Sequence, residues 1–467
     1  MKRLTATLLL LVPCSLLLAQ GIIDVHSHVI PAEYLSALKK ENKLMDEGFP
    51  LPKYDVERHL NWMDEAGVET SVLTLAAPQP SSAAIVRQTN EVAARIKKEH
   101  PGRFMFCAAL PLPDVNAAIR EAKYALDTLK ADGIKLATNV QGQYLGAPEL
   151  DTLFAFLNER EAVVILHPHR PEPVNREVMT QTPLAMQEYL SETTRAVTNM
   201  ISRNVLARYN NIKVVVPHCG AYLPLAMPRM KSLTPVMQAN KLVGEIDYEA
   251  NLRPLYYDLA GAHSPEVIRT LLTITTPDHL LYGSDFPYAA PQVLTQGLTR
   301  MKQYLTTEHD LAPYKEMILW KNAKWLFGQT SEKPTAAMHS ADSMIVRIAE
   351  IEVYPQYLKE YLAIAKEVDR LSIEREPGVI CLYPMQSSED SCQIRILEIY
   401  ASEEVYQAHL KTDHFQKYKQ GTLHMVKSLK LPLMQPLDLE TMKHIFRYCC
   451  PGKIQSASTY APIIRFS

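Results

Sequence analysis

Short apolar runs alternate with longer amphipathic stretches from Gly21 to about Gly328. Most of the short runs are apolar without interruption, as expected for strands that are buried on both faces. The predicted strands cover residues 22–25, 70–75, 104–110, 133–136, 162–166, 213–216, 256–259 and 279–282. Helical periodicity between them is clearest at residues 82–99, 115–129 and 149–160. This alternation predicts a parallel (β/α)8 TIM barrel over residues 21–328, and the absence of an early Gly-x-Gly-x-x-Gly disfavours the alternative, a doubly wound open sheet.

The pattern changes after a polar linker at residues 329–342. A strand is predicted at 344–353, a helix at 355–374, a hairpin of strands at 379–385 and 393–400, a helix at 403–427 and a short strand at 429–434. This β-α-β-β-α-β order predicts a small α+β ferredoxin-like domain over residues 343–440. Residues 441–467 form a tail without an interpretable pattern.

Residues 1–20 have the pattern of a secretory signal peptide. Lys2 and Arg3 precede an apolar run at residues 4–18, and small residues follow at a predicted cleavage point. The apolar run is shorter than the roughly 20 residues that a spanning helix needs, and no other segment is long enough. We therefore expect a periplasmic or secreted protein with no membrane span.

The charge balance narrows the class of partner. The net charge is −2, with 47% apolar and 21% charged residues, as in soluble globular proteins. Such a balance argues against a nucleic acid or an anionic membrane surface as partner. The cysteines are scattered and predict neither a disulfide framework nor a Cys-x-x-Cys metal site.

Histidines and one aspartate fall at the ends of predicted strands. His26 and His28 follow the first strand, and residues two apart in an extended segment point the same way. His167 ends the fifth strand, His218 ends the sixth, and Asp285 follows the eighth. Because barrel active sites lie at the C-terminal ends of the strands, these side chains are predicted to meet. Three imidazoles and a carboxylate suit Zn²⁺, and also accept Fe, Mn or Co.

Four motifs resemble those of the amidohydrolase superfamily, in its amidohydrolase-related branch of amino-carboxymuconate semialdehyde decarboxylase and resorcylate-type decarboxylases. They are Asp24-Val25-His26-Ser27-His28, His167-Pro168, His218-Cys219-Gly220-Ala221-Tyr222-Leu223-Pro224 and Tyr282-Gly283-Ser284-Asp285-Phe286-Pro287. The resemblance covers roughly residues 22–328. It implies one divalent metal, usually zinc, on four side chains: His26, His28, His167 and Asp285. It also implies acid/base roles for His218 and Asp285.

Arg229 bears on the reaction type. Decarboxylase-like members of the family place an arginine eleven residues after the catalytic histidine, the spacing of His218 and Arg229 here. A guanidinium binds a carboxylate bidentately, so Arg229 is a candidate substrate-binding residue, with a helix-capping or surface ion-pair role equally open. Arg170 is a weaker candidate. We predict a metal-dependent carboxy-lyase (non-oxidative decarboxylase) of a small carboxylic acid; the alternatives are a hydrolase of a lactone, ester or amide on the same site, and a binding protein with a vestigial barrel.

Three further polar residues lie near the predicted site. Lys135 is on the fourth strand, where some binuclear amidohydrolases carry a carbamylated lysine, but its neighbours are apolar and favour a mononuclear site. Asp258 ends the seventh strand and is expected to be structural or to support the ligands. His169 is likewise expected to support the site rather than to bind the metal.

The C-terminal domain resembles the antibiotic biosynthesis monooxygenase, or dimeric α/β barrel, family. The resemblance rests on the strand order, on residues 398–404, and on His409-Leu410 and His414-Phe415. It implies a homodimer, and a dimerisation module is favoured over a second catalytic domain. His409 and His414 are five residues apart on one predicted helix and share no face, so no metal site is expected between them.

Overall fold

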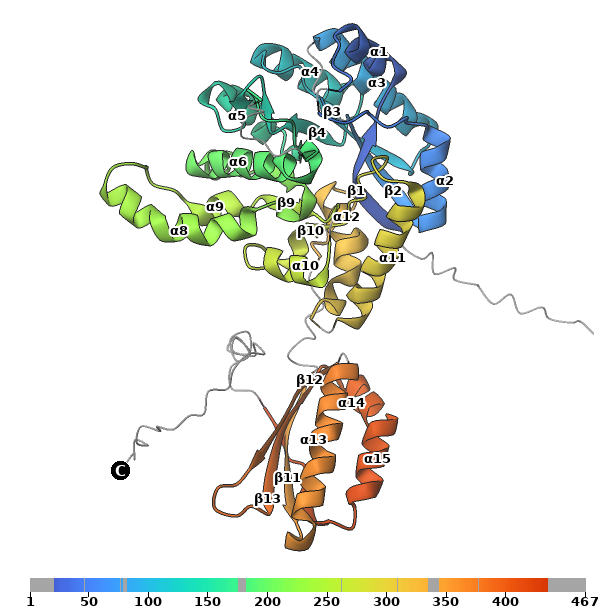
Figure 1. Ribbon diagram of the computed structural model, residues 1–467, viewed down its shortest axis with the longest axis vertical. Coiled ribbons are helices and arrows are strands. Elements are labelled where there is room, and N and C mark those ends of the chain that lie inside the picture. Colours follow the sequence, from blue (N-terminus) through green and yellow to red (C-terminus); the bar gives the residue numbers. More distant parts are fainter. Residues whose placement is uncertain are drawn as a thin grey trace, which may run out of the picture. The chain divides into compact units, whose positions relative to one another are not determined.

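The computed structural model describes residues 21–435, apart from 46, 76, 79–81, 175–181, 262, 309, 335–343 and 377. It divides into two compact units, with the boundary between residues 336 and 337 (Figure 1). The predicted signal peptide, most of the predicted linker and the predicted tail lie outside the described residues and stay predictions.

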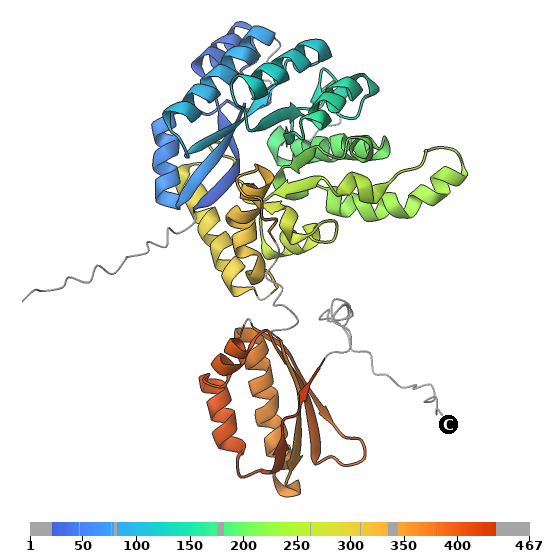
Figure 2. The ribbon, with the colours of Figure 1, turned by 180° about the vertical axis from the view of Figure 1, so that it is seen from behind.

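The N-terminal unit contains an eight-stranded parallel sheet that curls into a barrel (Figures 1 and 2). All eight predicted strands are present, and each is hydrogen-bonded to the next in chain order. They are β1 (Ile22–Val29), β2 (Val68–Leu75), β3 (Phe104–Ala109), β4 (Gly133–Ala137), β7 (Val163–His167), β8 (Lys213–Val216), β9 (Leu255–Asp258) and β10 (Leu280–Leu281). The prediction of a TIM barrel is confirmed. A short hairpin of β5 (Asn139–Val140) and β6 (Gln143–Tyr144) in the loop after β4 was not predicted.

The segment after β10 closes the barrel against β1. The backbone N–H of Asp285 donates to the carbonyl of His26 at 2.8 Å, and that of His28 donates to the carbonyl of Phe286 at 2.8 Å. Gly283 permits this close passage, because a Cβ atom there would lie 2.8 Å from that of His26. Barrel closure therefore brings the last predicted site residue next to the first two.

Helices cover the outer face of the barrel (Figures 1 and 2). They include α1 (Ala32–Lys40), α2 (Val56–Ala66), α3 (Ala83–Glu99), α4 (Val115–Asp127), α5 (Asp151–Glu159), α6 (Glu188–Ser202), α7 (Val205–Arg208), α8 (Leu223–Ala239), α9 (Tyr248–Leu252), α10 (Pro265–Leu271), α11 (Pro291–Thr307) and α12 (Asn322–Leu326). The three helices predicted most clearly correspond to α3, α4 and α5. Helix α4 begins after Asp114, whose carboxylate accepts the backbone N–H of Ala117 at 2.9 Å and caps the helix.

Apolar side chains fill the inside of the barrel. The inner cluster includes Ile23, Val72, Ile165 and Val215 from four strands, and Leu326 of α12 packs against it. Burial of such side chains contributes roughly 1.5–3 kcal/mol each before the loss of chain entropy is counted. Because the interior is packed in this way, the chemistry-bearing residues lie at the C-terminal ends of the strands rather than in a pore.

The described residues include no helix that is long and apolar enough to cross a membrane. Two cysteines of the barrel, Cys107 and Cys219, are buried thiols outside any disulfide. Burial raises the pKa of both thiols above the usual value for cysteine. Both side chains therefore pack as neutral, apolar groups.

The C-terminal unit is an antiparallel sheet with its helices on one face (Figure 1). Its elements are β11 (Ile345–Val353), α13 (Leu358–Arg375), β12 (Val379–Gln386), β13 (Gln393–Tyr400), α14 (Glu403–His409), α15 (Asp413–Thr422), β14 (Val426–Lys430) and β15 (Leu433–Met434). The sheet order is β12-β13-β11-β14, and β15 also pairs with β11. The predicted ferredoxin-like arrangement is confirmed.

One helix of this unit was predicted wrongly. The sequence pattern predicted a single helix over residues 403–427, whereas the chain forms α14 and α15 with a turn between them. Thr412 makes the turn: its hydroxyl donates to the carbonyl of His409 at 2.9 Å and accepts the N–H of Phe415 at 3.4 Å as a cap for α15. His409 and His414 therefore lie on different helices and come together beside Glu376, so the expectation that they share no face and offer no metal site is wrong as well.

Candidate active site

The four predicted metal ligands meet at the C-terminal end of the barrel. Each offers one ligand atom, and these atoms all lie within 4.8 Å of one another: His26, His28, His167 and Asp285. Asp285 Oδ1 lies 3.1 Å from His28 Nε2 and 3.5 Å from His26 Nε2. The three histidines are buried, whereas Asp285 is partly exposed. The strand-end positions read from the sequence thus converge on one point.

The other ring nitrogen of each histidine is held by a neighbour. The Nδ1 contacts are His26 with Asp258 Oδ2 at 2.9 Å, His28 with Thr74 Oγ1 at 3.0 Å, and His167 with the Pro168 carbonyl at 2.9 Å. Carboxylate and carbonyl oxygens only accept hydrogen bonds, so Nδ1 of His26 and of His167 carries a proton, and Nε2 is the nitrogen left to bind a metal. His26 Nε2 is buried and has no hydrogen-bond partner among the described residues. A buried ring nitrogen without a hydrogen-bond partner fits a metal ligand.

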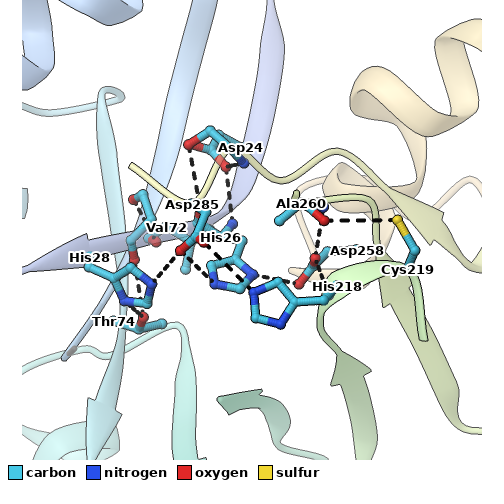
Figure 3. A network of polar contacts seen from close by, with 12 residues as sticks. Asp24, His26, His28, Val72, Thr74, His218, Cys219, Asp258, Ala260 and Asp285 are labelled. Atoms are coloured by element: carbon cyan, nitrogen blue, oxygen red, sulfur yellow. Dashed lines mark hydrogen bonds and ion pairs between the residues drawn. The ribbon is translucent and has the colours of Figure 1, made fainter. Parts of the chain in front are cut away.

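Asp258 organises two parts of the site at once (Figure 3). Its Oδ2 accepts from the His26 ring, and its Oδ1 accepts the backbone N–H groups of His218 and Ala260, both at 3.1 Å. Burial by itself raises the pKa of this carboxyl, but the charge and hydrogen bond of His26 outweigh burial and hold the pKa below its usual value. Asp258 is therefore a buried anion that orients one ligand and one strand-end loop.

Asp24 ties β1 to the loop that carries Asp285. Its Oδ2 accepts the Ser284 hydroxyl at 2.6 Å, and its Oδ1 accepts the backbone N–H groups of Ser284 at 2.9 Å and His26 at 3.1 Å. Burial raises the pKa of Asp24 to about 6. Asp24 belongs to a sequence motif, but no local pattern indicates its role, because its partner Ser284 lies 260 residues away.

Two turns at the site have strained backbone. His218 and Cys219 have φ angles of 55° and 56°, and Asp285 has φ 64°. Left-handed conformations of residues other than glycine cost about 1–3 kcal/mol each, and are held only where the surrounding structure supplies compensating contacts. At His218 and Asp285 such contacts are the backbone hydrogen bonds to Asp258 and His26.

His218 stands beside the ligand cluster rather than within it. Its Nε2 lies 3.8 Å from Asp285 Oδ2, and its Nδ1 is buried without a hydrogen-bond partner among the described residues. A histidine in this position can exchange a proton with the carboxylate or with a bound molecule. This placement agrees with the predicted division of roles between His218 and the four ligands, which stays a prediction.

A cavity of about 770 Å³ opens above the cluster. His167, His218 and Asp285 reach it, and the other lining residues are mostly apolar or aromatic: Phe49, Met186, Tyr189, Leu190, Pro224, Leu225, Val267 and Tyr288. The Tyr288 ring stands edge-on to His28 at 5.2 Å and to Phe49 at 5.7 Å between centroids. An apolar hollow of this size with a few polar groups at its floor suits a small ring-shaped ligand.

A buried carboxylate supports one wall of the cavity. Glu47 accepts the Tyr189 hydroxyl at 2.8 Å, and its other oxygen contacts the ring of His169. His169 is thus a supporting residue of the loop after β7. Sequence reasoning missed Glu47, Tyr189 and Tyr288, because they lie in loops and in α6 without a strand-end pattern.

The remaining candidates are not among the four side chains of the ligand cluster. Arg229 is exposed on α8 and does not line the cavity of its own chain. Arg170 contacts Glu172 at 3.0 Å and lines a separate hollow. Lys135 is buried on β4, where burial lowers its pKa to about 8. The substrate-binding role of Arg229 stays a prediction.

Comparison with known proteins shows the family. Residues 23–329 match the family model described as amidohydrolase. The chain belongs to the amidohydrolase family. Residues 344–421 of this amidohydrolase match a second family, antibiotic biosynthesis monooxygenase, in the position predicted for the ferredoxin-like domain.

Its similar proteins include decarboxylases. The chain is 34% identical to decarboxylase yanB of Aspergillus niger over 60% of its own length and 81% of that protein. It is 30% identical to 6-methylsalicylic acid decarboxylase of Penicillium expansum over 60% of its own length and 90% of that protein. The fold is that of a dihydroxybenzoic acid decarboxylase from a Polaromonas species, solved with manganese and the inhibitor 2-nitroresorcinol, at a TM-score of 0.56 and 20% identity over 66% and 97% of the two chains.

Proposed function

We propose that this amidohydrolase is a metal-dependent, non-oxidative decarboxylase of a small aromatic carboxylic acid. One observation carries the proposal: His218 and Asp285 face a cavity with aromatic walls directly above three histidines suited to a metal. The named activities of its relatives support it, since two of them act on 6-methylsalicylic acid and dihydroxybenzoic acid. Hydroxylated benzoic acids are therefore the substrate class to test first.

The four ligands His26, His28, His167 and Asp285 would hold one divalent ion. When bound, such an ion polarises a substrate oxygen and holds the acid group in place. Zinc suits three imidazoles and one carboxylate, and manganese is the ion in one solved relative. We propose zinc or manganese as the working metal.

The residues of the chain supply the rest of the reaction. The apolar walls bind the aromatic ring and exclude water, with Phe49 and Tyr288 on one side. His218 Nε2, which lies 3.8 Å from Asp285 Oδ2, carries a proton at the floor of the cavity. That proton passes to the ring carbon that bears the carboxylate. The carbon–carbon bond then breaks, its electron pair returns to the ring, and CO₂ leaves as a neutral molecule that an apolar cavity accommodates.

Three further proposals follow from the sequence. Arg229 binds the substrate carboxylate. It does not line the cavity of its own chain, so kinetics of an Arg229 variant are needed to test this role. The C-terminal domain joins two copies into a homodimer, and residues 1–20 direct export to the periplasm or the medium. The alternative function is hydrolysis of a lactone, ester or amide, which the same ligands and His218 would also support.

A product assay separates decarboxylation from hydrolysis. The full chain, loaded with Zn²⁺ or Mn²⁺, is incubated with a panel of hydroxylated benzoic acids and, separately, with aryl esters and lactones. We expect CO₂ and the matching phenol in equal amounts from at least one acid, with no turnover of the esters or lactones. Hydrolysis without release of CO₂ would support the alternative and overturn the proposal.

A further inference from the structure

Three ends of helices meet in the C-terminal domain. Glu376 directly follows α13, His409 is the last residue of α14, and His414 lies in the first turn of α15. His409 Nδ1 lies 3.0 Å from both carboxylate oxygens of Glu376, and His414 Nε2 lies 2.6 Å from Glu376 Oε1. One ligand atom from each side chain lies within 4.8 Å of the other two.

The cluster is enclosed on one side and reaches solvent on the other. His409 is 2% exposed, and its ring packs against Phe415 at 4.5 Å and Tyr400 at 5.3 Å. The side chains of Glu376 and His414 are 11% and 13% exposed. Two imidazoles and a carboxylate are thus held by rigid elements around a point that a small ligand can reach.

We propose that Glu376, His409 and His414 form a second site for a divalent transition metal, separate from the site in the barrel. Two imidazoles and one carboxylate are a borderline-soft set that binds Zn²⁺ or Fe²⁺ and leaves coordination positions open. Thr412 Oγ1 lies 3.3 Å from His414 Nε2 and adds an oxygen at the edge of the cluster. A water molecule or a small oxygen ligand would take the open position.

The geometry needs little rearrangement. Bonds of about 2.1 Å from a tetrahedral zinc ion place its nitrogen and oxygen ligands about 3.4 Å apart. The nitrogen–oxygen distances here are 2.6 and 3.0 Å, so the Glu376 carboxylate has to move by less than about 1 Å. In the barrel the matching distances from Asp285 to two histidines are 3.1 and 3.5 Å. The C-terminal cluster is therefore tighter than the barrel cluster by about 0.5 Å in each distance.

The competing explanation is a purely structural one. In it, the Glu376 carboxylate accepts hydrogen bonds from two imidazole N–H groups and holds the ends of the three helices together. That arrangement needs a proton on each of the facing nitrogens, whereas a metal needs a lone pair on each. A metal count on the full chain distinguishes the two.

The test removes the barrel site first. The double variant His26→Ala/Asp285→Ala and the unchanged chain are each saturated with Zn²⁺, freed of excess metal by gel filtration and analysed for zinc. We expect two ions in the unchanged chain and one in the double variant. Adding Glu376→Gln or His414→Gln to the double variant should remove the remaining ion, and adding His424→Gln, which changes an exposed histidine of the same domain, should not. Far-UV circular dichroism checks that each variant is folded.

A spectroscopic measurement covers the case in which a substitution disturbs folding. Co²⁺ added to the double variant, with the C-terminal domain unchanged, should give visible absorption bands of a nitrogen-ligated ion with a stoichiometry of one. A double variant that binds neither Zn²⁺ nor Co²⁺ would overturn the proposal, as would zinc binding that survives both Glu376→Gln and His414→Gln. Neither outcome bears on decarboxylation, because no activity is measured.

Discussion

His26 Nδ1 lies 2.9 Å from Oδ2 of Asp258, a carboxylate 232 residues further along the chain. Both side chains are buried, and the contact leaves His26 Nε2 facing the ligand cluster (Figure 3). The same carboxylate holds the backbone of His218. One buried anion thus sets the orientation of a predicted metal ligand and of a predicted proton carrier.

Replacing Asp258 by Asn should weaken metal binding without removing a ligand. The carboxamide keeps the size of the side chain but loses the anion that orients His26, so we expect the affinity for Zn²⁺ to fall about 10–100-fold. Competition with a chelator measures the change. Asp278→Asn is the matched control, because Asp278 also lies beside a histidine but at 3.7 Å and away from the cluster. Equal affinities for the two variants would contradict the role of Asp258.

Removing a ligand should have a larger effect. His26→Ala and Asp285→Ala each delete one of the four proposed ligands, so we expect the barrel site to lose its ion during gel filtration. His100→Ala, at the end of α3, is the control for the loss of a histidine elsewhere in the barrel. Zinc analysis measures the content of each variant. Full occupancy of the barrel site in both ligand variants would show that the ligand assignment is wrong.

His218→Asn tests the division of roles. Asn keeps a polar side chain but cannot carry a proton, so the metal content should persist while kcat falls by about 10²–10⁴. Steady-state kinetics and metal analysis on the same preparation give both numbers. An empty metal site in this variant would make His218 a ligand instead.

The barrel and the convergence of the four predicted ligands could be predicted because the signal is local. Each strand is a short apolar run. His167 is the last residue of β7 and His218 lies two residues after the end of β8, so position along the chain already gives position at the barrel mouth. Contacts such as His26 with Asp258 or Asp24 with Ser284 depend on barrel closure across more than two hundred residues. No local pattern marks them.

The histidines of the C-terminal domain show a different limit of prediction from the sequence. The sequence pattern places His409 and His414 on one helix, because no glycine or proline lies between these two residues. The break comes from Thr412, whose hydroxyl caps α15, and Thr followed by Asp is a typical helix start. That signal was present in the sequence, but the helical periodicity on both sides of Thr412 favoured a single continuous helix. The third member of the cluster, Glu376, lies on another element and could not be assigned without the fold.

His59 should make the stability of the barrel dependent on pH. It is buried and stacks on Phe286 at 4.1 Å, and burial lowers its pKa to about 3 from the usual 6.5. The folded state therefore binds fewer protons than the unfolded state between these values, so stability is complete above pH 6.5 and falls as the pH falls toward 3. At pH 5 the resulting decrease in the free energy of unfolding is about 2 kcal/mol.

Thermal unfolding at pH 7.5 and pH 5 measures this effect. His59→Phe keeps an aromatic ring for the stack and removes the titrating group, so the variant should lose less stability than the unchanged chain between the two pH values. An equal loss of stability in both proteins would show that His59 does not titrate as its burial implies.

The most direct test of the proposed function follows the atoms of the reaction. The metal-loaded full chain is given a hydroxylated benzoic acid in D₂O, and the product is analysed by mass spectrometry and NMR. We predict one CO₂ per product molecule and one deuterium at the carbon that carried the carboxylate, with the reaction lost in Asp285→Ala. Turnover that yields no CO₂, or decarboxylation that continues at full rate in Asp285→Ala, would contradict the account.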